Sequence, residues 1–206
     1  MKKLLAVIFL LIGINIYAQD KVYSTNEIVW FGLDFTKATF VGQFDQAMGA
    51  MPANGNDMKN KWIPGWNSLI VAEPQNFDFK KAFNKESVFL DITTMNSLNT
   101  KIDVNKCMDI NPGKIDRAEI DAMVKKYSSK DKKDGIGFSF IVENFDKGTQ
   151  MATVYVTFFD IATKKVLLCE SIQGKAAGVG MRNYWAGAIK SIIKKLAGGE
   201  FNSWKK

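Results

Sequence analysis

The chain has 206 residues, a formal net charge of +7 at pH 7, two cysteines and no histidine. Histidine is the commonest general base near neutral pH and the commonest ligand of transition metals. Its absence excludes Ser-His-Asp and Cys-His catalysis and the usual zinc sites, so we expect a non-enzymatic protein with no cofactor and no metal site.

The first eighteen residues, 1–18, have the features of a secretory signal peptide. Lys2 and Lys3 give a positive start, an apolar run follows over residues 4–14, and Ala18 is a small residue suited to signal peptidase. The run is shorter than the ~20 apolar residues that span a membrane. We therefore expect export to the periplasm or envelope, without a transmembrane helix and, because no cysteine follows the run, without a lipid anchor.

The remainder has the size of a single globular domain, which we expect over residues 19–199, with a flexible tail over residues 200–206. Its net charge is +5, because Lys2 and Lys3 are removed with the signal peptide. We interpret this mild excess as solubility, or as attraction to anionic membrane or cell-wall surfaces. Nucleic acid is not an expected partner of an exported chain.

The first half of the chain predicts two buried strands separated by helices. Residues 27–35 are apolar on both alternating faces, which is typical of a strand covered on two sides. A helical stretch, restarted at Pro64, reaches residue 73, and a short helix follows over residues 77–84. A second buried strand occupies residues 87–92. Because helices separate the strands, we expect a right-handed parallel crossover.

The second half predicts one helix and then three successive strands. Alternation of apolar and polar residues is clearest in the first two of these strands, and a short turn starting at Asp160 leads into the third. This pattern is typical of an antiparallel meander. The expected segments are a loop at 99–114, a helix at 116–127, and strands at 135–143, 151–160 and 166–172.

The last expected element is a strongly amphipathic helix, ended by Gly198 and Gly199. Together these elements predict an α/β fold in a single domain, with a mixed sheet of roughly five strands and helices on both faces. The alternative is a two-layer α+β arrangement. The apolar stripe of the helix consists of Met181, Trp185, Ala188, Ile189, Ile192, Ile193 and Leu196.

Cys107 and Cys169 are the only two cysteines. An oxidising compartment would permit a disulfide between them. Alternatively Cys169, which lies in an apolar strand pattern, is a free buried thiol that packs as a small hydrophobic side chain.

Trp62 and Trp66 are four residues apart, so their indole rings lie on one face of a helix. Such a pair forms either a platform on which a sugar ring stacks or a hydrophobic plug over the core. We favour the plug, because aromatic pairs at helical spacing usually pack inward.

The segment 174–180 is rich in glycine and lies between a strand and a helix. Backbone amides near Gly178 and Gly180, assisted by Arg182, are a candidate site for an anion. The spacing fits neither a P-loop nor a dinucleotide fingerprint. We therefore favour the interpretation that the glycines allow a sharp turn and close contact between strand and helix.

Asp34, Asp91 and Asp160 each follow an apolar strand run. Any two of these carboxylates brought together in a cleft would be able to perform acid-base chemistry. The simpler interpretation is that each one starts a turn or caps the next segment.

Residues 135–196 share their order of elements with a known group of proteins. The order is strand, strand, strand, glycine-rich turn and helix, and the second strand ends in Asp160-Ile161-Ala162-Thr163-Lys164-Lys165-Val166. It resembles the envelope group that includes the curli-secretion lipoprotein, the activators of penicillin-binding proteins and the N-terminal domain of the Tol-system propeller protein. The likeness rests on a D-x-x-T-G-x-V type of turn, and in this chain Lys164 stands where glycine would be usual. The resemblance implies a non-catalytic α/β module that binds or assembles with other proteins, and it assigns no binding residue.

Compartment, composition and resemblance together predict an exported, non-enzymatic protein that binds another envelope protein. The alternative is a periplasmic protein that binds or cleaves glycans, such as those of the cell wall. It would use Trp62 and Trp66 to stack sugar rings and carboxylates such as Asp91 and Asp160 for chemistry. The two hypotheses differ in whether the tryptophans face solvent beside a groove.

Overall fold

The computed structural model describes residues 19–45 and 51–205, so the expected signal peptide lies outside the described residues. Its strands are β1 (Glu27–Asp34), β2 (Thr39–Val41), β3 (Ser87–Leu90), β4 (Met108–Asp109), β5 (Ile136–Asp146), β6 (Met151–Asp160) and β7 (Val166–Lys175). Its helices are α2 (Gly55–Asp57), α3 (Ile63–Ala72), α4 (Phe79–Phe83), α5 (Thr93–Asn99), α6 (Arg117–Val124), α7 (Met181–Lys195) and α8 (Phe201–Ser203), with π-helical turns η1 (Met58–Trp62) and η2 (Leu196–Glu200).

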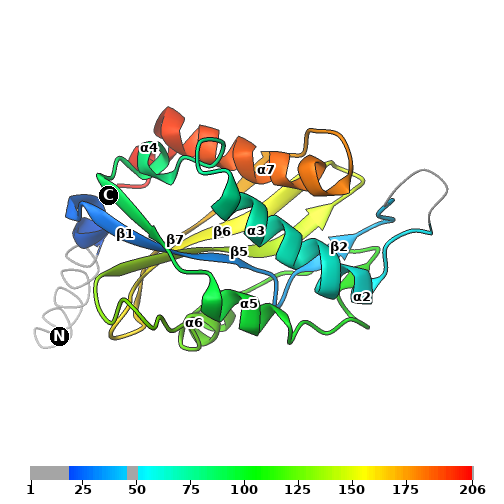
Figure 1. The fold of residues 1–206 in the computed structure, drawn as a ribbon, viewed down its shortest axis with the longest axis horizontal. Helices are drawn as coiled ribbons and strands as arrows, with labels where there is room; N and C mark the ends of the chain where they lie inside the picture. The colour runs from blue at the N-terminus through cyan, green and yellow to red at the C-terminus, as the bar shows by residue number, and fades with distance from the viewer. Residues whose placement is uncertain (1–18, 46–50, 206) are drawn as a thin grey trace, which may run out of the picture.

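The elements form three layers, in which a twisted sheet lies between helices on both faces (Figure 1). Helices α3, α4 and α7 pack on one face of the sheet, and α5 and α6 pack on the other. This arrangement confirms the predicted α/β fold with a mixed sheet and a C-terminal amphipathic helix. The two-layer alternative is wrong, because apolar side chains cover both faces of β1 and β5.

The central strand is β5, which pairs on one side with β1 and then β2, and on the other side with β6. Strands β3 and β4 extend the sheet beyond β1 and β2 in parallel, whereas β6 and β7 are antiparallel. All five predicted strands are present. The structure adds β2 and β4, which have three and two residues and are too short to show an alternating pattern.

Alternation along β5 and β6 divides the buried side chains between two cores, as the sequence predicts. The larger core lies beneath α3, α4 and α7, and the smaller one beneath α5 and α6. In the smaller core the ring of Phe31 contacts those of Tyr127 and Phe159. The strand residues of the larger core include Ile136, Phe138, Phe140, Val142, Ala152, Val154, Val156 and Phe158.

The predicted helix restart at Pro64 is confirmed. Asn54 and Asp57 form a reciprocal capping box at the start of α2, and the chain continues through η1 into α3, where Pro64 occupies the first turn. Proline is well tolerated there, because the first amide groups of a helix have no partner within it. The predicted helix at 116–127 likewise forms as α6, capped by Asp116.

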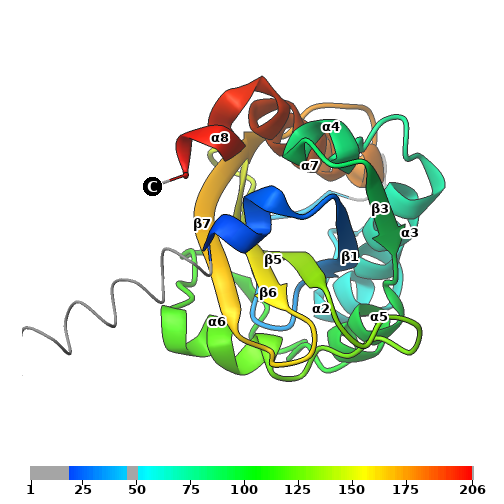
Figure 2. The same ribbon diagram turned by 90° about the vertical axis from the view of Figure 1, so that its left-hand side faces the viewer.

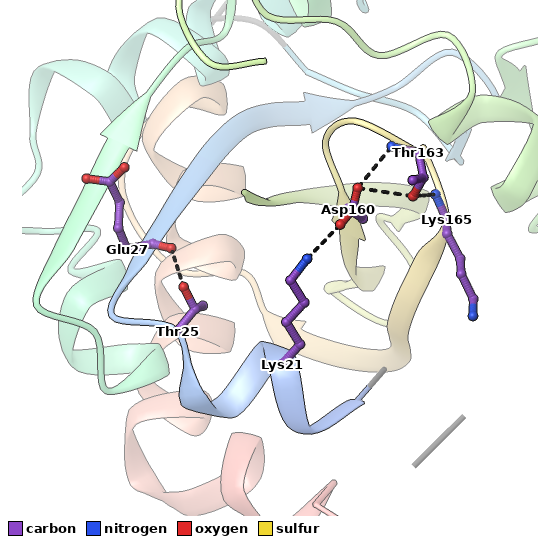
Figure 3. A network of polar contacts seen from close by, with 6 residues as sticks. All are labelled: Lys21, Thr25, Glu27, Asp160, Thr163 and Lys165. Atoms are coloured by element: carbon purple, nitrogen blue, oxygen red, sulfur yellow. Dashed lines mark hydrogen bonds and ion pairs between the residues drawn. The ribbon is translucent and has the colours of Figure 1, made fainter. Parts of the chain in front are cut away.

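Figure 3 shows the turn between β6 and β7, which Asp160 closes as predicted. Its Oδ1 accepts hydrogen bonds from the amide (2.9 Å) and the hydroxyl (3.0 Å) of Thr163, and its Oδ2 lies 2.8 Å from Lys21 Nζ. Partial burial would raise the pKa of Asp160, but the hydrogen bonds from Lys21 and Thr163 outweigh it and lower the pKa. Lys164 has φ 61°, a conformation that favours glycine.

The segment after α7 is packed against the core, which corrects the expectation of a flexible tail over residues 200–206. Gly199, with φ 117°, interrupts the helix, and the chain turns so that Phe201 is only 2% exposed. The ring of Phe201 lies 5.0 Å from that of Phe83 and 4.8 Å from that of Tyr23. Burial of this large ring supplies the free energy that orders the segment.

Replacing Ile192 by alanine tests the role of α7. Ile192 is fully buried against the sheet, so Ile192→Ala should lower the free energy of unfolding by ~2 to 5 kcal/mol. Lys194→Ala, on the exposed side of the same helix, is the matched control and should change it by ~0.5 kcal/mol or less. Urea denaturation of both variants measures the difference, and equal small effects would contradict the packing of α7.

The packing of the C-terminal segment predicts that Phe201→Ala destabilises the protein by ~3 to 5 kcal/mol, because the variant leaves a cavity between Tyr23 and Phe83. Asn202→Ala, at the neighbouring exposed position, should have little effect. Thermal denaturation followed by circular dichroism compares the two. A Phe201→Ala variant as stable as the parent would show that this segment is not held in solution.

Candidate functional site

The carboxyl end of β1 is held by two buried asparagines from opposite faces of the sheet. Gly32 adopts φ 112°, and the pairing of β1 with β5 shifts register between Trp30 and Leu33. Beyond this bulge, Asn67 of α3 accepts from the Leu33 amide (2.7 Å) and donates to the Leu33 carbonyl (3.0 Å). Asn99, at the end of α5, donates to the same carbonyl at 2.9 Å.

Asn99 also accepts a hydrogen bond of 2.7 Å from the amide of Phe35. The two side chains therefore satisfy backbone groups that the irregular ladder leaves without partners in a buried place. A side chain on Gly32 would collide with Asn67, because a Cβ at this position would lie 2.8 Å from Asn67 Oδ1. The bulge consequently depends on the two asparagines for hydrogen bonds, and Asn67 in turn needs glycine at position 32 for space.

Asp34 follows the bulge and is 1% exposed. Its Oδ2 accepts a hydrogen bond of 2.6 Å from the hydroxyl of Tyr127, and its Oδ1 accepts from the amide (2.8 Å) and the hydroxyl (2.7 Å) of Thr36. Burial raises the pKa of Asp34, although these hydrogen bonds oppose the shift. Burial and the neighbouring Asp34 also raise the pKa of Tyr127 well above its usual value.

A cleft of about 270 Å³ opens beside Asp34, between the C-terminal ends of α5 and α6. After β1 the chain continues to α3 on one face, and after β3 it continues to α5 on the other. Crevices at such a point, outside the carboxyl ends of parallel strands, are where open α/β sheets commonly bind ligands. Asp34, Thr36, Lys37, Leu98, Lys101, Met123 and Lys126 line the cleft.

Three lysines give this cleft a positive rim. The ammonium group of Lys37 forms an ion pair of 3.2 Å with Glu119. Those of Lys101 and Lys126 make no hydrogen bond or ion pair with any described residue. A second cavity, of about 320 Å³, adjoins the cleft and shares Thr36, Lys37 and Lys101 with it.

The structure does not bring the three strand-end aspartates together in this cleft. Asp91 accepts hydrogen bonds from the Ser129 hydroxyl (2.6 Å) and the Thr93 amide (3.1 Å). Asp160 lies at the opposite end of the sheet from Asp34, because its partner in β5 is Ile136 at the start of that strand. Asp91 and Asp160 therefore accept hydrogen bonds that stabilise the turns after their strands, as the simpler interpretation predicts.

The Ser-x-x-Lys spacing, which would suit Ser-Lys chemistry, occurs at Ser191 and Lys194, at Ser203 and Lys206 and, beside Asp91, at Ser129 and Lys132. The Ser129 hydroxyl donates to Asp91, and the ammonium group of Lys132 lies 2.6 Å from Glu27. The two functional groups thus have other partners and form no nucleophile-base pair.

Trp62 and Trp66 form the plug rather than the platform. Their rings stack 6.5 Å apart and are 9% and 1% exposed, and Trp66 Nε1 donates to the carbonyl of Arg182 at 3.0 Å. No broad indole face is left on which a sugar ring could stack. This corrects the alternative that treated the two tryptophans as a ligand-binding site.

The glycine-rich segment is a close contact between chain segments. Gly178 and Gly180 have φ of 135° and 74°, and a Cβ at Gly178 would lie 2.9 Å from the Asn183 carbonyl oxygen. The guanidinium of Arg182 bonds to Asn183. A cavity of about 210 Å³ nearby is lined by Gly178 but by neither Gly180 nor Arg182. The geometry therefore supports the turn, which the sequence also favours, over the candidate anion site.

Cys107 and Cys169 are both free thiols, so the disulfide considered from the sequence is not formed. Cys107 belongs to the larger core and Cys169 packs against the smaller one, on the other face of the sheet. Burial raises the pKa of both thiols, as expected of cysteines that pack as small hydrophobic side chains.

Strand β7 is a long edge strand. It has ten residues and, among the described strands, pairs only with β6, so no described strand lies beyond it (Figure 2). The amide of Ala176 bonds inward to Gln150, whereas the carbonyl of Gln173 accepts from Lys195 Nζ outside the sheet. Alternation along the strand then directs the backbone groups of Ser171 and Cys169 outward as well.

Comparison of the chain with protein-family models, curated proteins and solved structures finds no match. In the described residues, no helix is both long and apolar enough to cross a membrane, and no three acidic or cysteine side chains gather as metal ligands would. What the fold defines is an α/β protein with a mixed sheet, and its function has to be argued from its own sites.

Replacing Asn99 tests the connection that holds the end of β1. Asn99→Ala leaves the buried amide of Phe35 without a partner, so the free energy of unfolding should fall by ~1 to 3 kcal/mol. Asn96→Ala, on the exposed side of α5, is the matched control. Denaturant titration compares the variants, and hydrogen exchange at Phe35 should accelerate in Asn99→Ala alone. Unchanged exchange at Phe35 would contradict the assigned bond.

Asp34→Asn should change how stability depends on pH. Because burial raises the folded-state pKa of Asp34 above its usual 3.8, the stability that its protonation contributes is complete below that value and is lost as pH rises through the folded-state pKa. The free energy of unfolding of the parent, relative to Asp34→Asn, should therefore decrease as pH increases from about 4. Urea titrations of the parent and of Asp34→Asn at several pH values measure this difference in the free energy of unfolding. A difference between the parent and Asp34→Asn that stays constant with pH would contradict the shift.

Proposed function

We propose that this chain is an exported, non-enzymatic protein of the periplasm or envelope that binds another protein. The apolar run over residues 4–14 and the small Ala18 support export. The lack of histidine in the sequence removes the commonest catalytic base, and two of the strand-end aspartates, Asp91 and Asp160, are hydrogen-bonded within turns. The resemblance of residues 135–196 to envelope assembly modules favours the same role.

The outer edge of β7 is the observation that supports this proposal most directly. An edge strand offers a row of amide and carbonyl groups to which an extended segment of another chain can add as a further strand. The edge is ten residues long, and Ser171 and Gln173 on it are exposed. Charged side chains limit uncontrolled pairing, since Lys195 covers the Gln173 carbonyl and Lys175 ends the strand.

A proline substitution distinguishes pairing through this edge from other modes of binding. Ser171→Pro removes an amide that points away from β6, so the ladder inside the sheet keeps its hydrogen bonds while an added strand loses one. Ser171→Ala keeps the amide and is the matched control. Affinity purification of the tagged chain from its native envelope should recover the same protein partner with the parent and Ser171→Ala, and much less with Ser171→Pro.

Two further measurements complete this test. With the recovered partner added, hydrogen exchange at the Ser171 and Cys169 amides should slow, because they become hydrogen-bonded. Pull-downs with peptidoglycan and polysaccharide are run in parallel. Retention of glycan without any protein partner would contradict the proposal and favour the glycan-binding alternative. Equal partner recovery with Ser171→Pro and Ser171→Ala would show that β7 is not the binding edge.

A further inference from the structure

The cleft beside Asp34 has no part in the binding of a partner at β7. Its lining comes from the loop after β1 and from the ends of α5 and α6, whereas β7 lies at the far edge of the sheet beyond β6. The volume of the cleft, about 270 Å³, lies just below the range of roughly 300 to 1,000 Å³ that is typical of ligand pockets, and that of the adjoining cavity, about 320 Å³, lies at its lower end.

The charges on the rim select for an anion. Lys37, Lys101 and Lys126 line the cleft, and only Lys37 has an acidic partner there, Glu119. The adjoining cavity adds Lys106, which lies 3.8 Å from Asp103. Lys101 forms no ion pair with a described acidic residue, and the charge of Lys126 acts on Asp34 of the same cleft from beyond ion-pair distance. Both ammonium groups lie beside a crevice that is partly lined by apolar side chains, where an anion is only partly hydrated.

Asp34 sets the second requirement, which is a hydrogen-bond donor on the ligand. A carboxylate has about four acceptor positions. Three are used at Asp34, by the amide and hydroxyl of Thr36 and by the hydroxyl of Tyr127. The remaining position is the one that a ligand group would have to reach, since Asp34 lines the cleft although it is only 1% exposed. A ligand ammonium would satisfy it but would be repelled by the lysines, so a hydroxyl group fits better.

The apolar part of the lining completes the description of the ligand. Leu98 and Met123 are buried side chains that line the same cleft as the lysines and Asp34. They offer a surface for a short carbon skeleton. We infer that this cleft binds a small hydroxylated organic anion, such as a sugar acid or a sugar phosphate, with its anionic group at Lys101 and Lys126 and a hydroxyl group at Asp34.

Titration calorimetry at low salt tests this inference with D-glucuronate and glucose 6-phosphate as probes for the carboxylate and phosphate forms. We expect the chain to bind at least one of them, and to bind glucose or inorganic phosphate at least about fivefold more weakly. Glucose lacks the anionic group, and inorganic phosphate lacks a hydroxyl group on a carbon skeleton that could reach Asp34 while the anion lies at the lysines. Failure of both probes to bind overturns the inference. Equal affinity for glucose removes the anion requirement, and equal affinity for phosphate removes the hydroxyl requirement, so either result also overturns it.

Variants locate the binding site. Lys101→Gln and Lys126→Gln should each weaken binding of the preferred probe about fivefold, and the double variant more. Lys125→Gln, next to Lys126 but outside the lining, is the matched control and should bind as the parent does. Thermal denaturation confirms that the variants remain folded. Undiminished binding by a folded Lys101→Gln/Lys126→Gln protein would place the anion elsewhere and contradict the inference.

Discussion

The buried hydrogen bonds of Asn67 and Asn99 to the end of β1 are the constraint on which the functional end of this fold depends. The carbonyl of Leu33 receives a donor from each helix layer, so one backbone group connects α3, the sheet and α5. Without these amide groups, the bulge at Gly32 would leave buried backbone atoms unsatisfied, which is costly in a low-dielectric interior. The arrangement fixes where β1 ends and therefore where Asp34 lies.

This constraint also separates two regions with different properties. At the carboxyl ends of the parallel strands, the bulge and the buried pair Asp34–Tyr127 form the rigid floor of a cleft that has lysines at its rim. At the antiparallel side, β6 and β7 pair along most of their length, with one register shift between Phe158 and Phe159, and β7 leaves a row of backbone groups at the edge. Clefts such as the one beside Asp34 bind small molecules, whereas exposed edge strands such as β7 bind extended segments of other chains.

The parts of the fold that the sequence predicts are those that follow a local period. Residues 136–142 and 152–158 alternate and form strands, and the stripe of α7 is buried throughout. The cleft could not be predicted in this way, because its lining comes from residues near 34, 98 and 126, which no local pattern connects. Helix α5 has only seven residues, and nothing marks Asn99 as a buried partner of Phe35. Whether the indole rings of Trp62 and Trp66 are buried or exposed also depends on long-range packing, which the local sequence does not reveal.

The position of β1 in the middle of a parallel sheet has a consequence for how the chain folds. Its partners arrive late in synthesis: Asn99 follows Phe35 by 64 residues, and Ser139, which donates to the Gly32 carbonyl, follows Gly32 by 107. Long-range parallel pairing of this kind slows folding and leaves apolar strands uncovered meanwhile. During synthesis, the apolar segment from Ile28 to Leu33 therefore stays without its β5 partner until residue 141 has been made.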